Sequence, residues 1–325
     1  MRRWVSTHRV VVGIAAIVVL VLLGGGYVAW TAARQPAPTA NAAPPATGDL
    51  MFVDLTGDRN LVTTVKLAQP DGPRTVTDLR CQRYYRAAAT SVCLRIAGPG
   101  PSYEAAVWTS DKLVRTIPLP GIPSRARISA DGDMVSWTSF VTGDSYTVPG
   151  GFSTRSGVFN VRTAEVTDSI EHFTATVAGH VTPAADINYW GITVGDDDNT
   201  FYATMATSGR TYLMKGDLAA KTLQEVRQTA ECPSISPDGK RVAYKKRPTP
   251  TQPWELVVLD LAGKRELVLP GTAGIDDQAV WLDDATLAYG AAVNNQRSAI
   301  FFVPADGSAP AHRVVPDAAS PVPVR

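Results

Sequence analysis

The feature that most constrains this chain is a repeated unit of two apolar runs joined by a short polar turn. The unit occurs six times after residue 48, and successive turns lie roughly 44–55 residues apart. This pattern is typical of a β-hairpin. The six segments are DLMFVDLTGDRNLVTTVKL from Asp49, EAAVWTSDKLVRTIPL from Glu104, GVFNVRTAEVTDSI from Gly157, TYLMKGDLAAKTLQEV from Thr211, WELVVLDLAGKRELVL from Trp254 and AIFFVPADGSAPAHRVV from Ala299.

A second repeated element lies upstream of several hairpins. RARISADGDMVSW from Arg125 and PSISPDGKRVAYK from Pro233 share a Ser, an Asp-Gly pair and a following apolar run, and VWLDDATLAYG from Val280 is a shorter version. Gly tolerates the positive φ that such a tight connection requires. Two hairpins per period make a four-stranded blade, so the sequence predicts an all-β propeller of about six blades.

The expected blades cover approximately residues 49–80, 81–120, 121–174, 175–229, 230–271 and 272–325. A seven-bladed ring and a pair of β-sandwiches are the alternatives. GDLAAKTLQEVRQ from Gly216 has some helical spacing, but its place in the repeat assigns it to a hairpin.

The N-terminal segment predicts a membrane anchor. No charged residue occurs between Val10 and Ala33, a run long enough to cross a hydrocarbon core of about 30 Å. Arg2, Arg3 and Arg9 precede it, which places the N-terminus in the cytoplasm and the rest outside. A cleaved signal peptide is the alternative. We therefore expect a cytoplasmic segment 1–9, a transmembrane signal-anchor 10–33, a Pro/Ala-rich linker 34–48 and a propeller 49–325 in the cell envelope.

Charge argues against nucleic acid as a partner. The chain has 31 Lys and Arg against 30 Asp and Glu, a formal net charge of +1. No segment after the N-terminus gathers basic residues densely enough to follow a phosphate backbone.

The repeats resemble those of TolB-like β-propellers, whose blades carry a Ser-Pro-Asp-Gly turn followed by a Leu/Val-rich strand. The resemblance rests on SISPDGKRVAY and WELVVLDLAGKRELVL, and more narrowly the chain is similar to actinobacterial membrane-anchored TolB-like proteins. The segments that carry the narrower resemblance are CQRYYRAAATSVCL from Cys81, PSRARISADGDMVSWTSF from Pro123, GFSTRSGVF from Gly151, DINYWGITV from Asp186, FYATMATSGRTYLMKGDL from Phe201, ECPSISPDGKRVAYKK from Glu231 and DDQAVWLDD from Asp276. The resemblance implies a propeller in the cell envelope and supplies no settled activity.

Two of the three cysteines are expected to pair. Cys81 and Cys93 flank a predicted hairpin, and disulfides persist in exported domains. Free buried thiols are the alternative. Cys232 is then expected to be a small core residue.

No catalytic, cofactor or metal motif stands out. The chain has four His and no G-x-S-x-G nucleophile motif, no P-loop and no G-x-G-x-x-G. GDDDNT from Gly195 lacks the alternating ligands of a calcium loop, so a polar hairpin tip is the better interpretation. Paired carboxylates in the channel leave a glycan-directed extracytoplasmic hydrolase open as an alternative function.

The remaining hypothesis is a binding surface at the mouth of the central channel. The repeat register places several polar and aromatic residues near the start of innermost strands, where they are expected to meet. These candidates are Arg125, Arg127, Asp186, Asn188, Trp190, Asp277, Gln278 and Trp281. Polar groups around aromatic faces suit a ligand or peptide, although such residues also commonly bind backbone groups between blades. We expect a non-catalytic module that binds an envelope protein or peptide and needs no cofactor.

Overall fold

The computed structural model describes residues 9–33, 45–57, 60–98, 100, 102–141, 153–183, 186–249, 251–294 and 297–325. The chain divides into two compact units, Met1–Asn41 and Ala42–Arg325. Most of the predicted cytoplasmic segment and residues 34–44 of the predicted linker lie outside the described residues.

The first unit contains helix α2 (Arg9–Ala33). Its sequence RVVVGIAAIVVLVLLGGGYVAWTAA has no acidic residue in its first turn and no basic residue in its last turn. Among the residues that the structure describes, no helix is both long and apolar enough to be assigned as a membrane span. The anchor at residues 10–33 stays a prediction.

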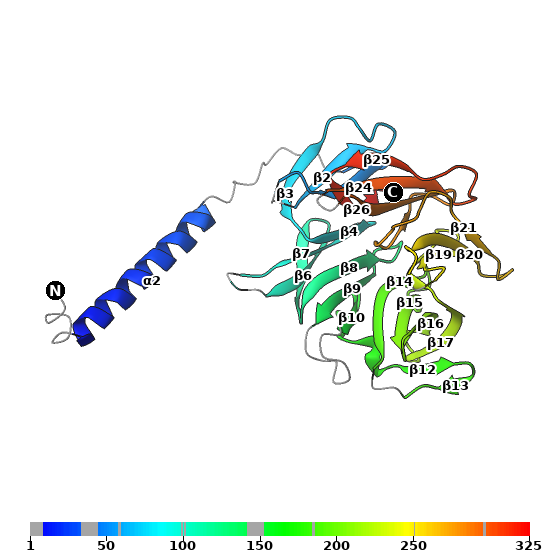
Figure 1. Ribbon diagram of the computed structural model, residues 1–325, viewed down its shortest axis with the longest axis horizontal. Helices are drawn as coiled ribbons and strands as arrows, with labels where there is room; N and C mark the ends of the chain where they lie inside the picture. The colour runs from blue at the N-terminus through cyan, green and yellow to red at the C-terminus, as the bar shows by residue number, and fades with distance from the viewer. Residues whose placement is uncertain are drawn as a thin grey trace. The chain divides into compact units, whose positions relative to one another are not determined.

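The second unit is an all-β propeller of six blades (Figure 1), so the predicted blade number is confirmed. Five blades are sheets whose strands follow one another in the sequence, and the innermost strand of each comes first. Their strands are β4 (Arg83–Ala87), β5 (Thr90–Ile96), β6 (Tyr103–Thr109) and β7 (Lys112–Leu119); β8 (Ile122–Ile128), β9 (Met134–Val141), β10 (Ser153–Asn160) and β11 (Val166–Thr167); β14 (Asn188–Val194), β15 (Thr200–Thr207), β16 (Arg210–Asp217) and β17 (Thr222–Gln228); β18 (Glu231–Ile235), β19 (Arg241–Lys246), β20 (Glu255–Asp260) and β21 (Glu266–Val268); and β22 (Val280–Trp281), β23 (Thr286–Asn294), β24 (Arg297–Pro304) and β25 (His312–Pro316).

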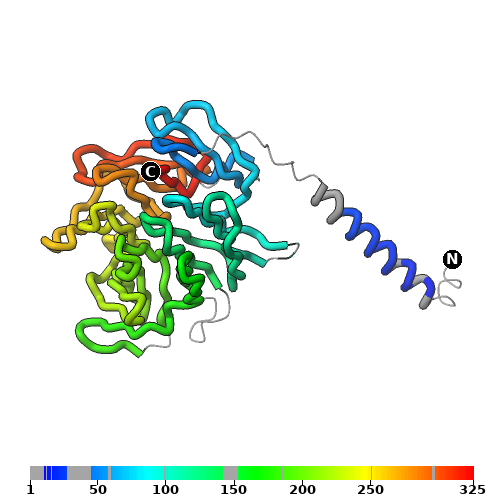
Figure 2. Tube along the Cα trace, turned by 180° about the vertical axis from the view of Figure 1, so that it is seen from behind, coloured from blue at the N-terminus to red at the C-terminus, as the bar shows by residue number. Residues whose placement is uncertain are grey.

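The remaining blade closes the ring and joins distant parts of the chain. It consists of β1 (Asp49–Asp54), β2 (Leu61–Lys66), β3 (Thr75–Arg80) and the inner strand β26 (Ala318–Pro323), which pairs antiparallel with β1. Figure 2 shows the first strands beside the last ones. The first predicted hairpin therefore occupies the second and third strands of its blade, whereas the other five supply the third and fourth.

One blade has more strands than the repeat predicts. After the short 3-10 helix η1 (Ile170–His172), β12 (Thr174–Val177) pairs parallel with β17, and β13 (His180–Val181) extends the sheet to six strands. The segment GDLAAKTLQEVRQ forms most of the β16–β17 hairpin, as its place in the repeat predicts.

The core lies between blades rather than in one central mass. Six clusters of buried hydrophobic residues each join two neighbouring blades, so every blade interface has its own core. The second and third strands of a blade are therefore mostly buried on both faces, which accounts for patterns such as the buried Leu256–Leu259 in β20.

The Ser-x-Asp-Gly element closes the turn after an inner strand. In the β8–β9 turn, the Ser129 hydroxyl donates to the Asp131 carboxylate at 2.6 Å and accepts from the Met134 amide at 2.9 Å, and Gly132 has φ +91°. Ser236 and Asp238 make the same pair of contacts after β18. These side chains replace backbone partners at the turn, so the element marks where each inner strand ends.

Candidate binding site in the central channel

The six inner strands line the central channel. They are β4, β8, β14, β18, β22 and β26, and because each pairs with the next strand outward in the same way, their carboxyl ends meet at one end of the channel. A cavity of about 100 Å³ opens there, and all six strands contribute to it. One residue from each strand or its end is Tyr85, Arg127, Val194, Ile235, Trp281 and Pro323. We call this cavity the carboxyl-end mouth.

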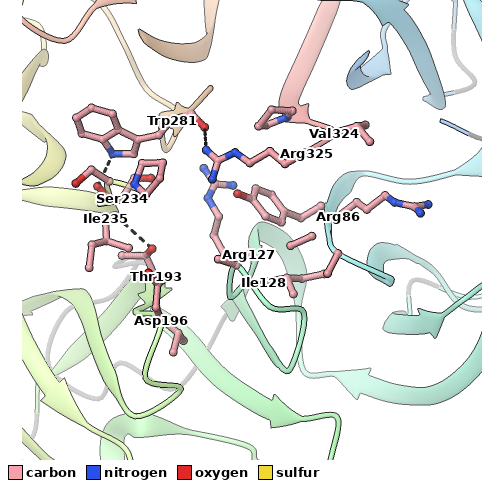
Figure 3. Close-up of a pocket in the computed structure, with 18 residues that line it drawn as sticks. Arg86, Arg127, Ile128, Thr193, Asp196, Ser234, Ile235, Trp281, Val324 and Arg325 are labelled. Atoms are coloured by element: carbon pink, nitrogen blue, oxygen red, sulfur yellow. Dashed lines mark hydrogen bonds between the residues drawn. The ribbon is translucent and has the colours of Figure 1, made fainter. Parts of the chain in front are cut away.

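Arg127 projects from β8 into the carboxyl-end mouth (Figure 3). Its guanidinium donates to the carbonyl oxygens of Ala126 at 2.9 Å, Gln278 at 2.7 Å and Ala279 at 3.1 Å. The same group lies 4.8 Å from the ring centroid of Tyr85. Its Nε is buried and has no hydrogen-bond partner among the described residues. The Arg127 guanidinium is thus a cation at the mouth, and the groups it contacts directly here are neutral.

Trp281 and Arg325 form another part of the wall. The Trp281 indole N–H donates to the Ser234 carbonyl at 3.0 Å, which fixes the buried ring against the neighbouring blade. Arg325 donates to the Trp281 carbonyl at 2.5 Å, and the Arg241 guanidinium lies 4.9 Å from the Trp281 ring centroid. Figure 3 shows the Arg325 hydrogen bond to the Trp281 carbonyl, with Arg127 lining the same cavity.

A charged group lies further along the channel, toward the starts of the inner strands. Asp277 has one carboxylate oxygen 3.6 Å from Arg125 Nε and the other 3.8 Å from an Arg83 terminal nitrogen. These three residues, with Gln278, line a second cavity of about 10 Å³, the size of one water molecule. Burial alone would raise the pKa of Asp277, but the guanidinium groups of Arg83, Arg125 and Arg127 outweigh it and lower that pKa. Asp277 therefore remains a carboxylate that balances buried cations.

Gln278 and Lys245 tie the channel wall together. The Gln278 amide nitrogen donates to the carbonyl oxygens of Gly191 at 3.2 Å and Pro233 at 2.6 Å, so one side chain joins three blades. Lys245, with a side chain 3% exposed, donates to Asp276 at 2.8 Å and lies 4.3 Å from the Trp254 ring centroid.

The structure brings together only part of the predicted rim. Arg125, Asp277 and Gln278 line the second cavity, Trp281 lines the carboxyl-end mouth, and Arg127 lines both. The sequence placed them all at one mouth because it did not distinguish the two ends of a short strand.

The other three predicted residues line neither cavity. Asp186 accepts hydrogen bonds from the Thr207 hydroxyl and the Ser208 amide, both at 2.7 Å, and so caps the β15–β16 hairpin. Asn188 binds Ser153 and Thr154 of the preceding blade at 2.8 and 3.0 Å. Trp190 is half-buried on β14. For Asp186 and Asn188, the contacts are those of residues that stabilise the fold.

Sequence reasoning missed Arg83, Tyr85 and Arg325. Arg83 and Tyr85 alternate on β4 as Arg125 and Arg127 alternate on β8, and this matching register was the available signal. Arg325 had no comparable signal, because it reaches the mouth only through the pairing of β26 with β1.

An acidic cluster lies at the turns that follow β8 and β14. Asp131, Asp133 and Asp198 have carboxylate oxygens within 4.8 Å of one another. Arg162 contacts Asp133 and Asp198, each at 3.1 Å. Burial and the neighbouring Asp131 and Asp133 raise the pKa of Asp198 to about 6. Arg162 already supplies the counter-charge here, and we assign no metal to the cluster.

Two of the three cysteines form a disulfide, and the third is free. Cys81 and Cys93 form a disulfide that links the start of one blade to its second strand, and Cys232 is a free buried cysteine.

The chain resembles known proteins in its fold, while no match was found in sequence. No protein-family model matches the chain, and no curated protein matches it in sequence. Among solved structures, TolB from Acinetobacter baumannii matches with 13% identity and a TM-score of 0.59, over 85% of this chain and 66% of that one. A Mycobacterium tuberculosis puromycin-hydrolyzing peptidase matches with 13% identity and a TM-score of 0.54, over 86% of this chain and 45% of that one.

A chain from a nidogen/laminin complex matches with 12% identity and a TM-score of 0.54, over 84% of this chain and 97% of that one. The chain thus spans about two thirds of the TolB chain and under half of the peptidase. These identities show a shared fold and no shared activity.

Proposed function

Because the fold is a TolB-like six-bladed β-propeller, we propose that this protein is a non-catalytic binding module of the cell envelope, tethered to the membrane by α2, that holds a protein or peptide at the carboxyl-end mouth. The observation that carries the proposal is the mouth itself. All six inner strands supply residues to one open cavity where a cation, Arg127, lies beside the aromatic rings of Tyr85 and Trp281. Convergent polar groups and aromatic walls suit recognition.

The two carboxylates that the sequence placed at the channel mouth, Asp186 and Asp277, support binding over hydrolysis. A glycosidase needs a carboxylic acid with a raised pKa opposite a second carboxylate. Asp277 is held ionised by arginines, and hydrogen bonds from Thr207 and Ser208 lower the pKa of Asp186. Neither residue has the properties of a general acid.

The structural neighbours include both kinds of protein. The nidogen/laminin chain comes from a protein complex, and the peptidase hydrolyses puromycin. The peptidase chain is more than twice as long as the part that matches. The likeness therefore supports a propeller fold and carries no argument about peptidase activity in this protein. We retain the extracytoplasmic hydrolase as the second candidate function, to be tested by substrate turnover.

The proposed tether rests on the sequence of α2 and on the cysteines. The run from Val10 to Ala33 has no charge and follows three arginines, the arrangement of a signal-anchor with a cytoplasmic N-terminus. The Cys81–Cys93 disulfide suits an oxidising compartment. We expect the protein to stay in membranes after carbonate washing and its propeller to be digested by protease added outside spheroplasts. Release by carbonate would contradict the tether.

The binding proposal is tested by crosslinking pull-down from membranes with tagged full-length protein. Arg127→Gln and Arg325→Gln alter the mouth, and Arg265→Gln makes the same charge change at a side chain 86% exposed on an outer turn. We expect a partner that the wild type and Arg265→Gln capture, that Arg325→Gln loses while retaining its melting temperature, and that Arg127→Gln loses where it folds. The proposal would be overturned if the mouth variants captured the same partner as the wild type. Turnover of a hydrolase substrate that depends on Asp277 would also overturn it.

A further inference from the structure

The two arginines of the carboxyl-end mouth lack an acidic partner. Among the described residues, neither Arg127 nor Arg325 has a carboxylate within ion-pair distance; their guanidinium groups donate to carbonyl oxygens. Other arginines near the channel differ, since Arg83 and Arg125 share Asp277 and Arg241 contacts Asp238 and Asp284. Arg127 and Arg325 are therefore cations at the mouth whose hydrogen bonds go to neutral carbonyl groups, and Asp277 acts on Arg127 only from a greater distance.

Both guanidinium groups lie at the same cavity. Arg127, Arg325 and Trp281 all line this cavity (Figure 3). Carbonyl contacts occupy the Nη atoms of Arg127, and its buried Nε still lacks an acceptor. An anion bound in this cavity would accept hydrogen bonds from two cations that have no carboxylate in direct contact.

The volume of the cavity and the charges around it restrict which anions can bind. The cavity of about 100 Å³ accommodates a group the size of a side chain. The turns that follow the inner strands surround this end of the channel with carboxylates, because they carry Asp131, Asp196, Asp238 and Asp284. Such an acidic surround repels a polyanion, while it favours cationic residues beside a single negative group.

We propose that the carboxyl-end mouth is a carboxylate-binding site that takes one Asp or Glu side chain of a protein segment with neutral or basic flanking residues. Arg127 and Arg325 hold the carboxylate, and the aromatic ring of the half-buried Tyr85 contacts the aliphatic part of the side chain. The acidic turns contact the flanking residues. The inference rests on the proposed function and specifies its ligand.

The test uses full-length protein in detergent and ligand-observed NMR, which detects weak binding. The probes are the capped peptide Ala-Lys-Glu-Lys-Ala, the same peptide with Gln for Glu, Ala-Glu-Glu-Glu-Ala, and succinate. We expect the Lys-Glu-Lys peptide to bind at least tenfold more tightly than the Gln peptide and the triple-Glu peptide. Arg325→Gln, at an exposed side chain, should remove this preference, as should Arg127→Gln where it folds, and Arg265→Gln should keep it.

Each other outcome has a defined meaning. Equal binding of the Glu and Gln peptides overturns the carboxylate site, and equal or tighter binding of succinate overturns a protein segment as the ligand. If the pull-down finds a partner at the mouth while the Glu and Gln peptides bind alike, this inference fails and the proposed function stands. If the preference appears and no partner is captured, the site stands and the proposed envelope partner fails.

Discussion

Asp277→Asn is the substitution whose cost the structure specifies best. The carboxylate lies 3.6 Å from Arg125 and 3.8 Å from Arg83. At an effective dielectric constant near 20, each pair has a Coulomb energy of about 4.5 kcal/mol, much of it offset by desolvation. Asparagine keeps the shape of the side chain but leaves three channel arginines without their shared counter-charge. We therefore expect a loss of about 3–5 kcal/mol in the free energy of unfolding.

The assay is thermal unfolding of the full-length protein, followed by far-ultraviolet circular dichroism. For a domain of this size, each kcal/mol lowers the melting temperature by about 2 °C, so Asp277→Asn should lower it by about 6–10 °C. Asp71→Asn is the matched control, because Asp71 is exposed in a turn, and we expect it to change the melting temperature by under 2 °C.

Acid should remove the difference between the two proteins. The arginines lower the pKa of Asp277 in the folded state. Its carboxylate therefore stabilises the fold above the unfolded-state pKa of about 4, and this contribution is lost as the pH falls through the folded-state pKa. Adding Arg83→Gln to Asp277→Asn should recover part of the loss by removing one unbalanced cation. Equal melting temperatures for Asp277→Asn and Asp71→Asn at neutral pH would refute this account of the channel.

Three further predictions concern the blades. Replacing Cys81 and Cys93 by Ser should lower the free energy of unfolding by about 2–3 kcal/mol, measured as a fall in melting temperature that reductant reproduces in the wild type and leaves unchanged in the variant. Because the pKa of Asp198 is raised to about 6, its ionisation disfavours the fold and wild-type stability should fall as the pH rises from about 4 to 6; melting curves of Asp198→Asn should show a flatter dependence between about pH 4 and 6, and an unchanged slope would exclude this carboxyl as the cause. A Cβ added at Gly216 would lie 2.1 Å from the Phe201 ring, so Gly216→Ala should destabilise the protein by about 1–3 kcal/mol, and a melting temperature within 1 °C of wild type would show that the ring moves aside freely.

The blade number could be predicted because the strand ends depend on contacts between residues that are close together in the sequence. A hairpin in each period, and a Ser-x-Asp-Gly turn in two of them, specify strand ends through contacts a few residues apart, as Ser129 and Asp131 show. The pairing of β26 with β1 has no local signal, so the sequence did not reveal which blade closes the ring. The extra strands β12 and β13 were missed for a similar reason, since β12 pairs in parallel with a strand that comes later in the chain.

The candidate site was predictable only in part. Alternation on an inner strand identified Arg125 and Arg127, because side chains two residues apart face the same way. Whether a polar residue faces the channel or the next blade depends on its partners, and Asn188 binds the preceding blade instead. The separation of the Asp277 group from the carboxyl-end mouth depends on depth along the channel, which spacing in the sequence does not show.

The pairing of β26 with β1 also has a consequence for folding kinetics. Leu50 pairs with Pro323, so the contact that completes the propeller joins segments separated by almost the whole domain. Forming such a contact requires a large loop to close and comes late and slowly compared with local hairpins. Until it forms, the edge of β1 is unpaired and available to other chains. A propeller synthesised from its N-terminus would therefore complete its ring only after its last blade has arrived, and chaperone protection would matter most during that interval.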